Sequence, residues 1–249
     1  RFPECTDPWE QRKLGDITTY YNGGSFENDV QENGQYELVT LKSINMEGKL
    51  VHSNRYVDVE EPTLAKGTLV MILSEQSPGL LGMTAQIPID NTYILNQRVA
   101  EIRPYSSINS YFLSMAINKN QRYFSKCGAG TKVQNISKPN VENFEFLCPI
   151  LQEQEKLGEF FKDFDNLITL HQRKLDNLKL KKKALLQKLF PKNGDRYPEL
   201  RFPGFTDAWE QRKLESLFTK YEDKVNTPSS GYWRLGLRSH CKGTFHTYI

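Results

Sequence analysis

A segment near the middle of the chain carries side chains that could contact DNA. Within residues 128–138, Gly128 and Gly130 allow the backbone to approach another surface closely. The polar members of this segment are Thr131, Lys132, Gln134, Asn135 and Lys138. Lysine and threonine suit phosphate oxygens, whereas asparagine and glutamine pair with the edge of adenine. The segment is therefore our first candidate for DNA contact, and an ordinary polar turn is the alternative interpretation.

The charge around this segment favours the same chemistry. No Asp or Glu occurs between Glu101 and Glu142, whereas the basic residues in this interval are Arg103, Lys119, Arg122, Lys126, Lys132 and Lys138. A basic surface binds DNA because neutralised phosphates release their counterions. We add Arg122 and Lys126 to the candidate DNA contacts. The alternative is a solvated surface that binds nothing.

Two further polar loops are candidates because each lies at the end of a predicted strand. The first loop contains Lys42, Ser43 and Asn45 and follows one strand, and the second contains Asn96, Gln97 and Arg98 and precedes another. These residue types are the ones that read base edges and hold phosphates.

Motifs for catalysis are missing from the sequence. It contains no phosphate-binding loop of the G-x-x-x-x-G-K-[ST] type, no dinucleotide fingerprint and no Asn/Asp-Pro-Pro-aromatic motif. The four histidines lack the spacing of metal ligands. We therefore expect no catalytic residues, no cofactor and no metal. Catalytic groups can still converge in space, and a nuclease is the enzyme hypothesis that DNA turnover by the isolated chain would support.

The cellular compartment follows from the cysteines and from the hydropathy. The four cysteines are scattered without a C-x-x-C pair, as in reduced thiols. No apolar run approaches the roughly 20 residues that cross a bilayer, and the first residues lack the apolar part of a signal peptide. We expect a cytoplasmic protein without membrane contact.

The elements that must position the candidate residues form an α+β domain. Strand-like apolar runs occupy residues 36–41, 69–73, 99–102 and 144–147, with glycine and proline between them. Residues 108–119 have the apolar spacing of a helix. The residues that we expect to pack in the core include Trp9, Leu14, Tyr123 and Phe124, although the last two could instead stack on DNA bases.

A long helix is predicted after this domain. Residues 152–190 contain no proline, and apolar positions recur at alternating spacings of four and three, which is the heptad pattern of a coiled coil. The predicted seam is Leu157, Phe161, Phe164, Ile168, His171, Leu175, Leu178, Lys182, Leu185 and Leu189. A seam needs a second helix, which we expect from another molecule. The polar members His171 and Lys182 lie at the seam edge or fix its register.

A repeat divides the chain. Residues 1–14 return as residues 201–214 with 11 of 14 positions identical. This spacing indicates the tandem duplication of a large module, of which residues 201–249 are only the opening. A quarter of a module is too short to bury a core. We therefore expect a chain that ends early and whose last 40 or so residues are poorly ordered or loosely packed.

These features together resemble the specificity subunit of type I restriction-modification systems. The resemblance rests on three segments: the repeated Thr-Asp-x-Trp-Glu-Gln-Arg-Lys-Leu opening, the Gly-Ala-Gly-Thr-Lys-Val-Gln-Asn-Ile run at residues 128–136, and residues 149–191. It implies a mixed α/β target-recognition domain at residues 1–150 and a spacer or dimerisation helix at 151–191. Residues 192–249 would be a linker and the incomplete start of a second target-recognition domain.

The resemblance also implies partners. In that family each recognition domain reads one half of a bipartite double-stranded DNA site, and the helices bind modification subunits, which recruit the restriction subunit. With one domain and one helix, this chain would pair with a second copy or with another specificity subunit. The alternative is a truncated interaction protein that pairs through its helix as a decoy or an inactive remnant. Salt-dependent, sequence-selective DNA binding distinguishes the two hypotheses.

Overall fold

The structure is a computed structural model. It describes residue 2, residues 4–75, 79–130 and 132–219, and the backbone of residues 233–237 and 244–248. The contacts divide the chain into two compact units, residues 1–173 and residues 174–249, and the boundary falls in the sequence of the long helix. The expectation of loose packing in the last 40 or so residues falls mostly outside the described residues.

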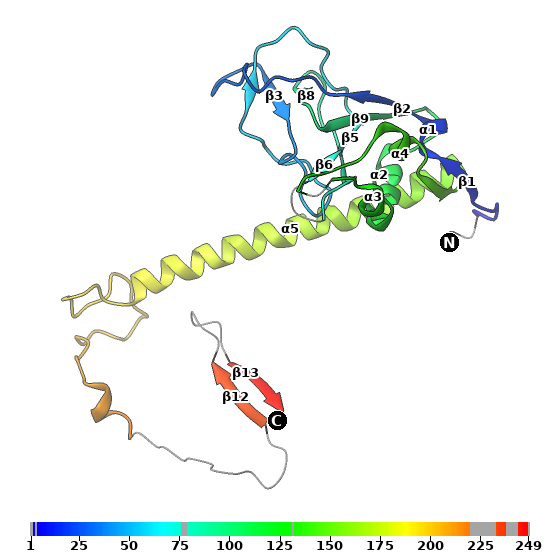
Figure 1. Cartoon of the computed structure of the whole chain (residues 1–249). Helices are drawn as coiled ribbons and strands as arrows, with labels where there is room; N and C mark the ends of the chain where they lie inside the picture. The colour runs from blue at the N-terminus through cyan, green and yellow to red at the C-terminus, as the bar shows by residue number, and fades with distance from the viewer. Residues whose placement is uncertain are drawn as a thin grey trace. The chain divides into compact units, whose positions relative to one another are not determined.

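The first unit contains the elements of an α+β domain (Figure 1). Its strands are β1 (Glu10–Lys13), β2 (Thr18–Asn22), β3 (Tyr36–Val39), β4 (Tyr56–Val57), β5 (Leu69–Ile72), β6 (Ser74–Glu75), β7 (Thr84–Gln86), β8 (Tyr93–Leu95), β9 (Val99–Pro104), β10 (Gln134–Asn135) and β11 (Glu145–Cys148). Its helices are α1 (Leu14–Ile17), α2 (Ser110–Lys119), α3 (Gln121–Cys127), α4 (Lys138–Glu142) and the beginning of α5 (Leu151–Leu189).

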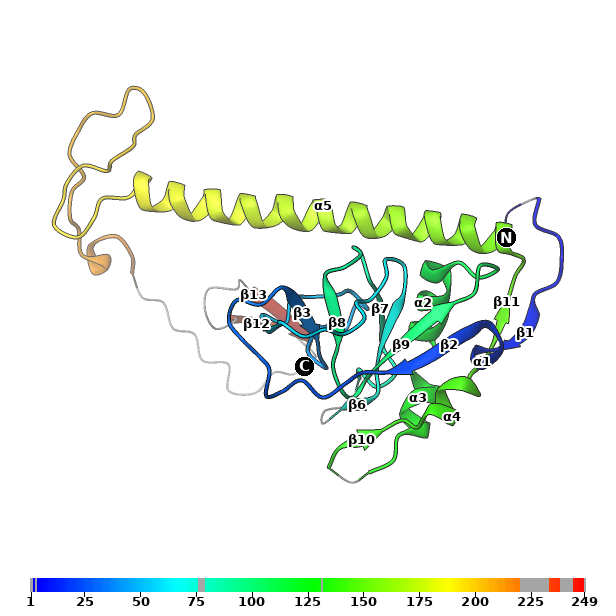
Figure 2. The same cartoon turned by 90° about the horizontal axis from the view of Figure 1, so that it is seen from above.

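The central strand β5 separates two apolar cores. It lies in an antiparallel sheet of order β2-β9-β5-β7. Leu69 and Met71 belong to the core shared with helices α1 to α4, whereas Val70 and Ile72 belong to the core shared with β3 and β8. Because both faces of the strand are buried, its sequence is a continuous apolar run rather than an alternating one. Figure 2 shows these helices and the β3-β8 pair at different places along the sheet.

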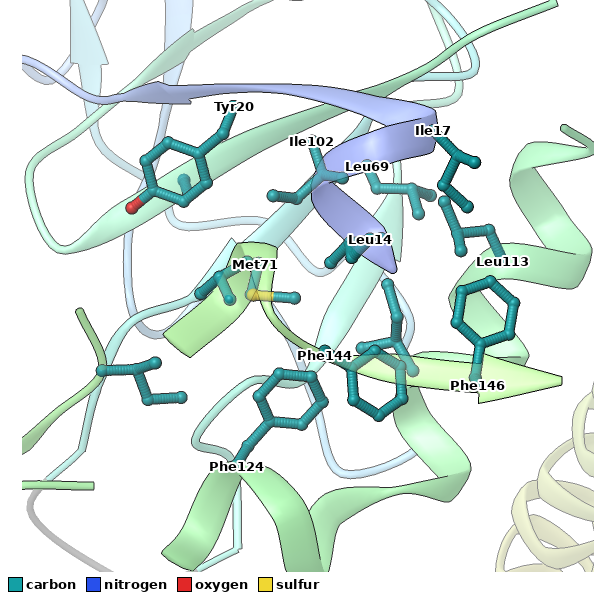
Figure 3. Packing of buried hydrophobic residues seen from close by; sticks show 14 of the residues in the cluster. Leu14, Ile17, Tyr20, Leu69, Met71, Ile102, Leu113, Phe124, Phe144 and Phe146 are labelled. Atoms are coloured by element: carbon teal, nitrogen blue, oxygen red, sulfur yellow. The ribbon is translucent and has the colours of Figure 1, made fainter. Parts of the chain in front are cut away.

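Aromatic side chains fill the core on the helical side. The rings of Phe124 and Phe144 lie 5.0 Å apart, next to Leu14 and Met71 (Figure 3). Phe124 and Leu14 are almost fully buried, which confirms the sequence-based prediction for both. Trp9 is 39% exposed and therefore does not belong to the core as predicted, although its ring meets Phe112 edge-on at 6.3 Å.

The α+β class and the long helix are confirmed, and the differences concern short elements. Helices α3 and α4 were not predicted, because each is too short to display an apolar period. The glycine-containing segment begins where α3 ends at Cys127. It includes β10, a two-residue strand that pairs with β6 and therefore depends on a partner distant in sequence.

The start of α5 is attached to the domain through polar contacts. Gln154 is buried, and its Oε1 accepts a hydrogen bond of 2.9 Å from the backbone N–H of Asn109. Further along the helix, the phenol of Tyr111 donates to Asp165 at 2.7 Å. Among the described residues, no helix is long and apolar enough to cross a membrane.

The second unit contains the second copy of the repeat, residues 201–214. Its described elements are the end of α5, a 3-10 turn at Leu214–Ser216, and the antiparallel hairpin of β12 (Trp233–Leu237) with β13 (Thr244–Tyr248). Residues 10–13 form β1 by pairing with β11, whereas the equivalent residues 210–213 are not in a strand. Nearly identical sequences therefore differ in structure, because a β-strand needs a partner strand.

Candidate nucleic-acid interface

Two of the predicted loops converge because they follow parallel strands. β3 and β8 pair in parallel, with Leu38 opposite Ile94 and Val39 opposite Leu95. The backbone N–H of Asn96 then donates 3.0 Å to the carbonyl oxygen of Val39. The carboxyl ends of parallel strands lie at one edge of a sheet. The segments 40–45 and 96–98, which are far apart in sequence, therefore meet there.

Leu73 joins this edge to the third predicted segment. Its backbone N–H donates to the carbonyl oxygen of Arg98, and its carbonyl oxygen accepts from the N–H of Ile136, both at 2.9 Å. The pairing of Ser74 with Asn135 continues the contact. We call the surface formed by residues 40–45, 55, 96–98 and 132–136 the strand-end edge.

A depression of about 510 Å³ lies in the strand-end edge. Its lining residues are Glu27, Thr40, Leu41, Lys42, Ser53, Arg55, Asn96, Gln97 and Arg98. It thus brings together Lys42, Gln97 and Arg98, which the sequence nominated from separate loops. Three cationic side chains and one carboxylate line this depression, so its local charge is positive.

Glu27 and Arg55 form an ion pair that lines the depression, and neither residue was predicted from the sequence. The guanidinium of Arg55 donates to Glu27 at 2.5 Å, and the side-chain amide of Asn96 donates to the other carboxylate oxygen at 2.8 Å. These hydrogen bonds, the one from Arg55 foremost, lower the pKa of Glu27 below its ordinary value. Glu27 and Arg55 are 28 positions apart in loops without periodicity, so no local sequence signal identifies the pair.

Arg98 has an unusual backbone conformation. Its φ of 66° places it in the left-handed region, which costs a residue other than glycine on the order of 1 kcal/mol. It occupies the tight turn between β8 and β9, and its side chain is exposed. The turn therefore presents an arginine at a position where the backbone alone would favour glycine.

A second basic surface adjoins the strand-end edge. Arg122 and Lys126 are exposed, lie one helical turn apart on α3, and line a depression of about 520 Å³ together with Glu75. One carboxylate oxygen of Glu75 accepts backbone hydrogen bonds from residues 79, 80 and 81. Since β6, which contains Glu75, pairs with β10, this depression lies next to Gln134. In Figure 2, α3 and β10 lie at the bottom of the view, away from α5 at the top.

The remaining predicted contacts differ in how accessible they are. Lys132 and Asn135 are exposed and Gln134 is partly covered. Ser43 is buried, and its hydroxyl accepts from the N–H of Thr40 at 2.9 Å.

Three other candidates have different environments. Asn45 accepts from two backbone N–H groups of its own turn through Oδ1. Lys138 lies 3.5 Å from a carboxylate oxygen of Glu142 and over the ring of Tyr20, away from the edge. Thr131 lies outside the described residues.

The predicted seam of α5 is largely exposed. Leu157 packs against the core of the domain and Leu189 is partly covered. The other seam positions are exposed, and they are Phe161, Phe164, Ile168, His171, Leu175, Leu178, Lys182 and Leu185. A stripe of this kind is the apolar surface that a second helix could cover.

The strand-end edge is equipped for contact with nucleic acid. Lysine and arginine can neutralise phosphates, and the guanidinium and amide groups of Arg55 and Gln97 can read base edges. Within the described residues, no group of three or more His, Cys, Asp or Glu could hold a metal ion.

Comparisons with known proteins identify the family of the chain. The sequence model of a family described as "Type I restriction modification DNA specificity domain" matches residues 6–180. A protein of Methanocaldococcus jannaschii described as the MjaX type I restriction enzyme specificity subunit is 25% identical, over 94% of this chain and 58% of its own length. The MjaVIII specificity subunit of the same organism is 23% identical, over 87% of this chain and 50% of its own length. The chain therefore spans about half the length of the curated relatives it matches.

Solved structures share the fold. The S subunit of a type I restriction-modification system from M. genitalium is similar with a TM-score of 0.53 at 16% identity, over 75% of this chain and 46% of that one. The HsdS subunit from Thermoanaerobacter tengcongensis gives a TM-score of 0.50 at 17% identity, over 76% of this chain and 46% of that one. At these identities the likeness concerns the fold alone.

Proposed function

Because the chain belongs to the type I restriction modification DNA specificity family, we propose that it is a DNA sequence-recognition subunit of a type I restriction-modification complex. Residues 1–150 form the target-recognition domain and read one half of a bipartite double-stranded site. Residues 151–191 form the spacer and docking helix. Residues 192–249 form a linker and the start of a second recognition domain.

The convergence of the predicted loops is the observation that carries this proposal. Lys42, Gln97 and Arg98 line one depression, and the backbone of Leu73 connects Arg98 to the segment that contains Gln134 and Asn135. A groove-reading surface needs cations for phosphates beside donors and acceptors for bases, within the span of a few base pairs. The strand-end edge supplies both kinds of group.

The subunit itself carries out no chemistry in this proposal. Methylation and cleavage belong to the modification subunit and to the restriction subunit recruited through it. The exposed seam of α5 supports a docking role, because an apolar stripe on a helix is stabilised by covering it with another helix. The covering helix belongs to a second specificity chain, and the modification subunit docks on the resulting pair.

DNA binding by the purified full chain tests the proposal. Selection from a pool of duplexes with a randomised block identifies the preferred sequence, and fluorescence anisotropy measures the affinity over a salt series. We expect a preference of about 10³-fold or more over a scrambled duplex and an affinity that falls steeply with salt. The change Lys42→Ala should weaken binding to every duplex and reduce the salt slope by about one.

A matched control lies at the other end of β5. Lys66 is exposed and precedes this strand, whereas the strand-end edge follows it. Lys66→Ala should leave the affinity unchanged. A chain that pairs through its helix but shows no salt-dependent, selective binding would be the decoy or remnant instead. Cleavage or methylation of DNA by the chain alone, given only a metal ion or a methyl donor, would contradict the non-catalytic assignment.

A further inference from the structure

We propose that Arg55 reads a guanine in the DNA target, and that Glu27 and Asn96 are the positioning residues that hold its guanidinium for this contact. The inference rests on the proposed function and specifies the base that the depression in the strand-end edge recognises.

The first argument is the rigid connection between Arg55 and the core. Asn96 is 2% exposed and its backbone N–H is bonded to the end of β3. Its side-chain amide donates 2.8 Å to one oxygen of Glu27, whose other oxygen accepts from Arg55 at 2.5 Å. The backbone carbonyl of Arg55 is itself fixed by the N–H of Leu38 at 2.8 Å. Hydrogen bonds therefore fix both the backbone and the guanidinium of Arg55.

The second argument is that the guanidinium of Arg55 keeps hydrogen-bond donors available after its contact with Glu27. A guanidinium has five N–H donors in a planar fork, and the contact with Glu27 uses the Nη2 group. The side chain of Arg55 is 38% exposed and lines the depression, and the contact with Glu27 leaves its other N–H donors without a partner among the described side chains. Two such donors match the N7 and O6 acceptors of guanine in the major groove. Because Glu27 already orders the side chain, binding costs less rotamer entropy.

The third argument separates a base contact from a phosphate contact. A phosphate beside Arg55 would approach the ionised Glu27, and two negative charges at short range repel each other. The acceptors of guanine carry no net charge, so this repulsion does not apply to them. Lys42 and Arg98 line the same depression, and within the described residues neither side chain forms a hydrogen bond or an ion pair with Glu27, so both suit the phosphates on either side.

The experiment uses the full chain and the duplex chosen by selection. Each guanine in turn is replaced by 7-deazaguanine, which lacks the N7 acceptor, and the affinities of the wild type, Arg55→Lys and Glu27→Gln are compared. Lysine keeps the charge but lacks the fork. Glutamine keeps an acceptor for Asn96 but removes the charge. Lys42→Ala serves as the phosphate-contact reference, and thermal unfolding verifies that each variant is folded.

The expected result is a single guanine at which 7-deaza substitution weakens the wild type about 5- to 100-fold. At this guanine, 7-deaza substitution should cause almost no further loss of affinity in Arg55→Lys and a reduced loss in Glu27→Gln. In Lys42→Ala it should cause the same fold loss as in the wild type. A merely structural role of Arg55 would lower the melting temperature without changing any base preference.

Three results would overturn the inference while leaving the proposed function intact. They are a selected site without guanine, an Arg55→Lys chain that keeps every preference, and a uniform loss of affinity over all duplexes, which marks a phosphate contact. Absence of selective binding by the wild type would overturn the proposed function itself, and the inference with it.

Discussion

The backbone N–H of Leu73 donates a hydrogen bond of 2.9 Å to the carbonyl oxygen of Arg98. Leu73 directly follows the central strand β5 and is buried, whereas the side chain of Arg98 is exposed. The contact therefore attaches an exposed arginine directly to the buried end of the central strand. A side chain on a turn fixed in this way keeps its position relative to the other loops of the edge.

The left-handed backbone of Arg98 leads to a first prediction, for Arg98→Gly. Glycine adopts the observed φ of 66° without strain, and this gain opposes its greater entropy in the unfolded chain. The free energy of unfolding should change by less than about 1 kcal/mol, while DNA affinity falls several-fold and the salt slope decreases by about one. Denaturant titration and anisotropy measure the two effects.

Asn91→Gly is the matched control for this prediction. Asn91 also has a positive φ, of 54°, and lies outside the strand-end edge. Its replacement also removes a positive-φ side chain, together with the hydrogen bond that Thr63 donates to it, and should leave DNA binding unchanged. If Arg98→Gly bound DNA as tightly as the wild type, Arg98 would form part of the turn without contacting DNA.

A second prediction concerns Gly158 and Asn109, which meet where α5 packs on α2. The side chain of Asn109 caps α2 by accepting from the N–H of Phe112 at 2.9 Å, and a Cβ on Gly158 would lie 2.9 Å from the same oxygen. Gly158→Ala gains about 1 kcal/mol of helix propensity but displaces the cap, which is worth about 1 kcal/mol. The net change in the free energy of unfolding should be close to zero.

Removing the Asn109 cap first should reveal the gain in helix propensity from Gly158→Ala. Asn109→Ala alone should destabilise the chain by about 1 kcal/mol, and adding Gly158→Ala to it should stabilise by about 1 kcal/mol. Urea titration of the four chains gives the coupling. Strictly additive effects would mean that the two residues do not contact each other in solution.

A third prediction concerns alkaline pH. Burial, with the nearby charge of Glu142, raises the pKa of Tyr20 to about 12, against about 10 for an unfolded tyrosine. Between these values the unfolded chain releases a proton that the folded chain retains. The contribution of Tyr20 to stability is thus complete below pH 10 and is lost as the pH rises toward 12.

Tyr20→Phe should therefore flatten the decline of stability between pH 10 and 12. At pH 7 it should cost about 1 kcal/mol, because the phenol donates to Asn22 at 2.7 Å. Denaturant titrations over this pH range measure both effects. Equal alkaline slopes for the wild type and the variant would contradict the burial of this hydroxyl.

A fourth prediction concerns the seam of α5. Leu178→Asp places a charge at an exposed apolar position of the predicted seam, where a partner helix would have to bury it. We expect a dimer at micromolar concentration for the wild type and a monomer for the variant, measured by light scattering over a concentration series. Leu180→Asp is the control, because Leu180 is 67% exposed, against 55% for Leu178, but lies off the seam. A wild-type monomer would exclude self-pairing and point to a different partner chain.

Much of the architecture could be predicted from local patterns. The long helix follows from a heptad spacing that only a helix satisfies, and its observed bounds, Leu151–Leu189, lie within two residues of the expected 151–191. The β5 and β9 strands follow from their apolar runs. The two-residue strand β10 could not be foreseen, because its existence depends on pairing with β6.

The candidate site shows the same division. The sequence by itself determined which residue types could meet DNA and in which loops, because residue chemistry and strand ends are local properties. Only the tertiary structure decided that Lys42 and Arg98 share one depression and that Glu27 pairs with Arg55. It also decided that the hydroxyl of Ser43 is buried in a hydrogen bond within its own turn. Those relations depend on which strands become neighbours in the sheet, and hydrogen bonding between distant segments, not spacing along the chain, determines that order.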